Sequence, residues 1–139
     1  MRELLWVYVA GKVSDDNSSI QDVITQFRQA GFAISHDWTR ASGIEKPYLE
    51  HVEWNRAAAE AMRAGVKRSE VFVLLCGGDI YGAMVEFGMA ISEPLQDPFN
   101  RRRIYVVGDP KELRQSIFFT LLEVAVCESV EEVLADLGH

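Results

Sequence analysis

Five short runs of mostly apolar residues most constrain what this chain can fold into, because a strand buried on both faces leaves almost no place for a polar side chain. The runs are residues 4–10, 32–35, 70–76, 103–107 and 122–127. Stretches with the 3.6-residue apolar repeat of an amphipathic helix separate most of them. This alternation predicts an α/β fold, a five-stranded, mainly parallel, doubly wound sheet of the flavodoxin or Rossmann type with helices on both faces.

Four amphipathic stretches predict the helices of this fold, over residues 18–31, 49–65, 83–93 and 129–137. Ser129, with Glu132 three residues later, has the pattern of a capping box at the start of the last helix. Gly65 is expected to end the second helix, whose alanine-rich face would allow close packing on a sheet. Trp6 and Trp54 are expected in the core, where tryptophan is usually found.

The length of 139 residues indicates a single domain that spans residues 1–139. The formal net charge is −7, so the chain has no overall positive field that would attract phosphate groups. We therefore expect neither nucleic acid nor an anionic membrane as its main partner. The one basic run, residues 101–103, is interpreted as a solvated loop before a strand.

The cysteines and the first apolar run indicate a cytoplasmic protein. Cys76 and Cys127 both lie in apolar, strand-like segments, and we expect them to be buried free thiols in a reducing compartment. The run at residues 4–10 is too short to span a membrane, and its flanks do not make a signal peptide.

Several well-known site patterns are missing from the sequence. Residues 11–14, which follow the first strand, carry neither G-x-G-x-x-G nor the lysine pattern of a P-loop. The chain has no G-x-S-x-G elbow, and its histidines and cysteines do not cluster at metal-ligand spacing. We therefore expect no cofactor and no metal ion.

Glu86 is a carboxylate flanked by apolar residues near the start of the third predicted helix, and Asp79 lies in the turn before that helix. In a doubly wound sheet the ligand crevice lies outside the carboxyl ends of the strands, where both residues would lie. A helix amino terminus stabilises an anion, so Glu86 is expected to stay ionised even when partly buried. It could then attack a sugar anomeric carbon, while Asp79 donates a proton to the leaving base or binds a sugar hydroxyl. Alternatively, Glu86 is a solvent-facing helix residue and Asp79 an ordinary turn residue.

Two stretches, "LLWVYVAG" and "GAMVEFGMA", carry patterns of a known family. The first ends in Tyr-x-Ala-Gly and the second contains Gly-x-x-x-Glu-x-Gly-x-Ala. The residues in these patterns are Tyr8, Ala10, Gly11, Gly82, Glu86, Gly88 and Ala90. Both patterns resemble the nucleoside 2-deoxyribosyltransferase family, including the related 2′-deoxynucleoside 5′-phosphate N-hydrolases, and the resemblance covers the whole chain in the order of its elements.

The resemblance implies cleavage or transfer at the N-glycosidic bond of a (deoxy)nucleoside or nucleotide. Glu86 would be the nucleophile, and Tyr8 would orient its carboxylate through a hydrogen bond. Asp79 would occupy the place of the aspartate that family members carry before the signature. Glycines expected at the substrate site are Gly11, Gly78 and Gly82. The turn lacks the serine that grips phosphate in family members, so nucleoside and monophosphate substrates both remain open. The resemblance also implies a homo-oligomer, a dimer or higher.

His36, Asp37 and Trp38 end the second predicted strand at the same edge of the sheet. Trp38 could stack on a base, Asp37 could hydrogen-bond to it, and His36 could lie near a phosphate or hydroxyl. In the alternative interpretation, Trp38 covers the core and the other two residues form a local polar turn.

Two other function classes remain open. One is a module of the same fold that binds or senses a nucleotide-like ligand without catalysis. The other is a TIR-like enzyme that cleaves NAD, because the spacing of Asp79, Gly82 and Glu86 is similar to the arrangement in TIR domains. Release of free base from a panel of nucleosides, their monophosphates and NAD would distinguish the three.

Overall fold

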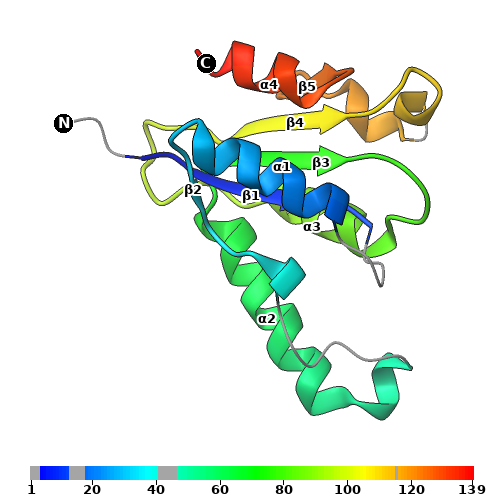
Figure 1. Ribbon diagram of the computed structural model, residues 1–139. Coiled ribbons are helices and arrows are strands. Elements are labelled where there is room, and N and C mark those ends of the chain that lie inside the picture. Colours follow the sequence, from blue (N-terminus) through cyan, green and yellow to red (C-terminus); the bar gives the residue numbers. More distant parts are fainter. Residues whose placement is uncertain (1–3, 13–17, 41–46, 115) are drawn as a thin grey trace.

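The computed structural model describes residues 4–12, 18–40, 47–114 and 116–139 (Figure 1). It contains one sheet of five parallel strands in the order β2-β1-β3-β4-β5. The strands are β1 (Trp6–Ala10), β2 (Ala33–Ile34), β3 (Val71–Leu75), β4 (Arg103–Val107) and β5 (Val124–Cys127). The predicted α/β, doubly wound class is confirmed, and the strand order is the one found in flavodoxin-like sheets.

Helices cover both faces of the sheet. They are α1 (Ser18–Gln29), α2 (Val52–Arg68), α3 (Tyr81–Ser92) and α4 (Val130–Asp136). The connection through α1 runs outward from β1 to β2, whereas the connections through α2 and α3 run in the opposite direction across the sheet. Because such crossovers are right-handed, α1 lies on one face and α2 and α3 lie together on the other. Within the described part of the β4–β5 connection, two short 3₁₀ turns, η3 (Glu112–Arg114) and η4 (Ile117–Thr120), stand where a helix would complete the alternation.

The register of the strands decides which side chains face which helices. Tyr8 in β1 lies opposite Phe72 in β3, and the two rings stack at 5.9 Å between centroids. Phe72 in turn contacts Phe87 of α3, so this face of the sheet packs under α3. Tyr105 points to the other face, where its phenol donates a hydrogen bond to an Asp136 carboxylate oxygen at the end of α4. Tyr8 is therefore aimed at α3.

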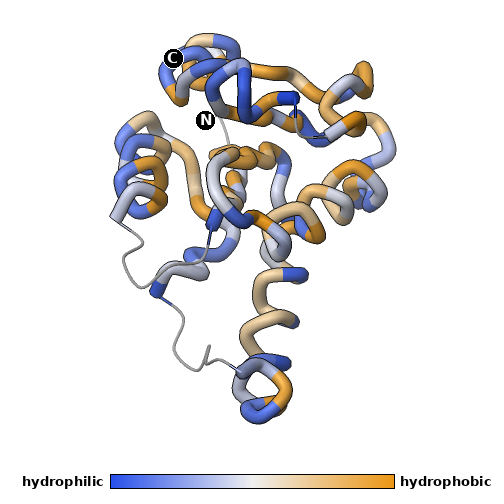
Figure 2. Tube along the Cα trace, turned by 90° about the vertical axis from the view of Figure 1, so that its right-hand side faces the viewer, coloured by the Kyte–Doolittle hydropathy of each residue, from blue (hydrophilic) through white to orange (hydrophobic). Residues whose placement is uncertain are grey.

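The helix α2 begins and ends later than predicted. Its amino-terminal half projects beyond the sheet, as Figures 1 and 2 show, and Gly65 lies inside the helix instead of ending it. The expectation that Trp54 and Trp6 belong to the core is wrong, because their side chains are 66% and 44% exposed. Trp54 lies on the projecting half, where no strand is available to cover it.

The interpretation of the basic run, residues 101–103, as a solvated loop is wrong for Arg102. Its side chain is only 8% exposed, whereas its neighbours in the run are exposed. The guanidinium donates hydrogen bonds to the carbonyl oxygens of four residues at the carboxyl ends of α2 and α3, namely Lys67, Ser69, Ala90 and Glu93. Burial lowers the pKa of this guanidinium. Arg102 thus satisfies helix-end carbonyls that have no partner within their helices.

The outermost strand β5 is only partly covered. Val124 and Cys127 are buried, but Ala125 and Val126 are exposed. Helix α4 follows β5, and the Ser129 hydroxyl accepts a hydrogen bond from the Glu132 amide, as in the predicted capping box. The Glu132 carboxylate accepts from the Glu128 amide, one residue before the position that a capping box uses. Both cysteines are free, with Cys127 buried and Cys76 half-buried.

Candidate active site

Tyr8 and Glu86, 78 positions apart in the sequence, meet between the sheet and α3. The phenol of Tyr8 donates a hydrogen bond to a carboxylate oxygen of Glu86, which lies in the second turn of α3. Tyr8 has no exposed surface and Glu86 is half-buried. Glu86 is therefore not the solvent-facing helix residue of the alternative interpretation.

Burial changes the acidity of both partners. Desolvation raises the pKa of Glu86 to about 7, against a smaller lowering by the hydrogen bond from Tyr8. Burial, followed by the nearby charge of Glu86, raises the pKa of Tyr8, so the phenol stays protonated and remains a donor. Glu86, which was expected to stay ionised, is thus ionised only above about pH 7, because desolvation outweighs the lowering by the Tyr8 hydrogen bond.

The pair lies at the point where the topology of the sheet reverses. From β1 the chain crosses to β2 on one side, whereas β3 and β4 follow on the other. The carboxyl ends of β1 and β3 therefore flank the switch point, which is where doubly wound sheets bind ligands. The turn after β3 requires glycine, because Gly77 and Gly78 have φ values of +146° and +61°.

A cavity of about 310 Å³ adjoins this turn and the start of α3, a volume at the lower end of small-molecule sites. Its lining residues are Gly78, Asp79, Ile80, Tyr81, Met84, Ser116 and Phe119. Of the residues expected at the site, Gly78 and Asp79, which are adjacent in the sequence, both line this cavity. Glu86, two residues beyond Met84 on α3, is not among its lining residues.

A second cavity, of about 620 Å³, lies at the opposite end of the sheet, beside the amino ends of β1 and β3. It is lined by Trp6 at the start of β1, by Glu70 before β3, by the end of α2 and by the segment after α3. The Arg68 guanidinium lies over the Trp6 ring there, 6.0 Å from its centroid. This cavity lies away from the carboxyl ends of the strands and does not include Tyr8 or Asp79.

The other two glycines expected at the site have different surroundings. Gly11 is buried, and a Cβ there would come within 2.9 Å of the Ile20 side chain, so it allows α1 to approach the end of β1. Gly82 is exposed, with open space where a Cβ would be. Lys12 was not predicted, yet its ammonium nitrogen lies 3.3 Å from the place of a Gly78 Cβ. The sequence signal that could have pointed to Lys12 is its position directly after Gly11, a residue expected at the site.

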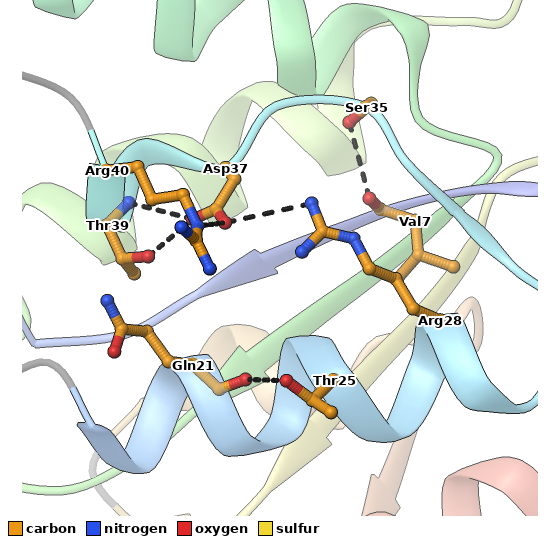
Figure 3. A network of polar contacts seen from close by, with 8 residues as sticks. All are labelled: Val7, Gln21, Thr25, Arg28, Ser35, Asp37, Thr39 and Arg40. Carbon is orange, nitrogen blue, oxygen red and sulfur yellow. Dashed lines mark hydrogen bonds and ion pairs between the residues drawn. The ribbon is translucent and has the colours of Figure 1, made fainter.

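Asp37 and Trp38 are engaged within the protein (Figure 3). One carboxylate oxygen of Asp37 accepts hydrogen bonds from the amide and hydroxyl of Thr39, and the other accepts one from Arg40 and lies 3.7 Å from Arg28. Trp38 is 3% exposed, and its indole donates to the Val9 carbonyl at 2.7 Å. Trp38 therefore lies in the core, as in the alternative interpretation, and does not present its ring to a ligand.

His36 lies deeper than the sequence suggested. Its Nε2 atom is buried and has no hydrogen-bond partner within the described part of the chain. Burial lowers the pKa of the imidazole, against a smaller effect of Asp37, so the ring is neutral. The backbone of Gly65 packs against His36 and the Tyr8 ring at the same time.

Among residues 4–12, 18–40, 47–114 and 116–139, no group of three or more His, Cys, Asp or Glu residues is placed to hold a metal ion. The helices in these ranges are too short or too polar to cross a membrane. Comparison with known proteins found no family model that matches this chain and no matching curated protein.

Proposed function

We propose that this protein cleaves or transfers the N-glycosidic bond of a (deoxy)nucleoside or nucleotide, with Glu86 as nucleophile. The observation that supports this most is the hydrogen bond from the Tyr8 phenol to the Glu86 carboxylate, beside the reversal point of the sheet. A buried carboxylate held by one donor keeps a second oxygen for reaction. The neighbouring cavity, with Asp79 in its lining, offers space for the leaving base.

The proposed reaction has two steps. A carboxylate oxygen of Glu86 bonds to the anomeric carbon, the carbon–nitrogen bond breaks, and its electron pair leaves with the base, which takes a proton from Asp79. Water, or a second base, then attacks the anomeric carbon, loses its proton to Asp79 and releases the Glu86 carboxylate. Because the nucleophile must be ionised, the rising limb of the pH dependence of kcat/KM should have its midpoint at about 7, the pKa of Glu86.

Free base released from a panel of deoxynucleosides, ribonucleosides, their 5′-monophosphates and NAD tests the proposal. We expect Glu86→Gln to lower the rate more than about 10³-fold and Tyr8→Phe about 10- to 100-fold. Glu60→Gln makes the same chemical change on an exposed position of α2 and should leave the rate unchanged.

Three results would contradict the proposal in different ways. Turnover of NAD alone would favour the TIR-like activity. No release of base from any compound, while one of them still raises the melting temperature, would favour the binding module, since a ligand that binds only the native state stabilises it. Full activity of Glu86→Gln would remove the proposed nucleophile.

We also propose that two copies of the chain associate through α2 and α3. Large apolar side chains are exposed on these helices and on η2 (Tyr48–Glu50), which precedes α2. They are Tyr48, Leu49, Val52, Trp54, Tyr81 and Val85. The amino-terminal half of α2 projects away from the sheet (Figure 2). The only charged residue in α3 is Glu86, and a helix this apolar is typical of one buried in an interface.

A further inference from the structure

Gly65 stands at an unusually close contact between α2 and the sheet. A Cβ atom built on Gly65 would lie 2.5 Å from the Cβ of His36 and 3.1 and 3.2 Å from two ring carbons of Tyr8. Real Cβ atoms do not come within 3.0 Å of such neighbours, and the His36 Cβ is tied directly to the backbone, so it cannot move alone. Only glycine fits here with the present backbone.

Hydrogen bonds hold α2 at this short distance. The buried Ser35 hydroxyl donates to the Gly65 carbonyl at 2.7 Å, and the Ser35 amide donates to the Val7 carbonyl of β1 at 2.9 Å. Figure 3 shows Ser35 beside Val7. One turn further, Arg68 donates to the Ser35 carbonyl at 2.6 Å. The carboxyl-terminal part of α2 is thereby fastened to the strand that carries Tyr8.

A glycine inside a helix costs about 1 kcal/mol relative to alanine. Two other glycines lie within helices of the described residues, Gly82 and Gly88 in α3, and both have open space where a Cβ would be. Gly65 alone of these three is explained by close packing, and it packs against both His36 and the Tyr8 ring.

We propose that Gly65 is a positioning residue for the Tyr8–Glu86 pair, whose missing side chain lets α2 hold the Tyr8 ring where its phenol reaches the Glu86 carboxylate. This role rests on the proposed function only in that the pair is taken as the reacting centre. A Cβ at position 65 would require the Tyr8 ring to give by a few tenths of an ångström, which disturbs the hydrogen bond from its phenol to Glu86. For comparison, a misplacement of about 1 Å can cost about a hundredfold in rate.

The test follows the carboxyl carbon of Glu86 by NMR on protein labelled with ¹³C-glutamate, the signal being assigned by its loss in Glu86→Gln. Because the Tyr8 hydrogen bond lowers the pKa of Glu86, Gly65→Ala should raise that pKa above about 7. Tyr8→Phe should raise it as well, and Gly65→Ala should add nothing in the Tyr8→Phe background. Gly88→Ala, the matched control, should leave the pKa unchanged.

An unchanged Glu86 pKa in folded Gly65→Ala would overturn the inference, and so would a shift that persists in full without the Tyr8 phenol. If Gly65→Ala does not fold, His36→Gly removes the shorter of the two contacts, and the double variant should fold and show the raised pKa. Failure of this rescue would contradict the contact geometry itself. The measurement needs no turnover, so it can fail or succeed independently of the proposed reaction.

Discussion

At the scale of single residues, the acidity of Glu86 ties the candidate site to the stability of the fold. Its pKa is raised from 4.5 to about 7 by burial, so between these values the native state binds more protons than the unfolded chain. Stability from this group is then complete below pH 4.5 and is lost as the pH rises to about 7. The maximum effect is about 3 kcal/mol, from 1.36 kcal/mol for each pKa unit.

Glu86→Gln should therefore stabilise the protein selectively at high pH. Glutamine is neutral and keeps an oxygen that can accept from Tyr8, so it resembles the protonated acid. We expect the variant to exceed the wild type by about 1–3 kcal/mol at pH 8 and to differ little at pH 4.5, as measured by urea denaturation. An equal stability difference at both pH values would mean that the charge of Glu86 does not cause the difference.

The roles of single residues could be predicted where a local sequence pattern indicated them. Glu86 was predicted because it is a carboxylate near a helix start at the carboxyl edge of the sheet. The hydrogen bond from Tyr8 was expected only because the family resemblance implies it. Gly65 and Arg102 were not predicted, because their roles depend on distances between elements. Nothing local distinguishes a glycine that ends a helix from one that admits a tyrosine ring, or a buried arginine from the two exposed ones beside it.

At the scale of elements, the sequence pattern predicted the buried strands best and the packing of α2 least well. Strand β4 has the predicted bounds, because its apolar run is buried along almost its whole length. The alanine-rich face of α2 was expected to allow close packing on the sheet, but only Ala58, Gly65 and Val66 are buried. Periodicity shows that a helix has an apolar face without showing how far along that face the sheet extends.

Arg102 connects two of these elements, and its replacement should loosen both. Arg102→Lys keeps the positive charge but loses the planar fork that reaches four carbonyl groups, so buried acceptors are left without donors. We expect a loss of about 3 kcal/mol in the free energy of unfolding, measured with urea. Arg101→Lys, on the exposed neighbour, should change it by less than about 0.5 kcal/mol. Similar small losses in both variants would exclude the role given to Arg102.

At the scale of the whole molecule, the proposed association of two chains can be tested with variants that should not affect folding of the monomer. Val85→Glu and Trp54→Glu place a charge on α3 and α2 at exposed positions, so each should leave the monomer folded. We expect light scattering after gel filtration to give twice the chain mass for the wild type and the mass of one chain for both variants. Phe99→Glu, an equally drastic change on an exposed side chain outside both helices, should stay dimeric. A monomeric wild type at about 100 μM would contradict the proposal.

The incomplete cover of β5 has a consequence for solubility. An outermost strand offers unpaired amide and carbonyl groups to any other extended chain, and the sequence of β5, Val-Ala-Val-Cys, would suit such pairing. Exposed glutamates, Glu123 and Glu128, stand directly before and after it and repel an identical edge. The net negative charge of the whole chain adds to this repulsion and vanishes near its isoelectric point of about 4.9. Acidification to that pH therefore removes the net repulsion that keeps neighbouring molecules from adding their own strands to this sheet.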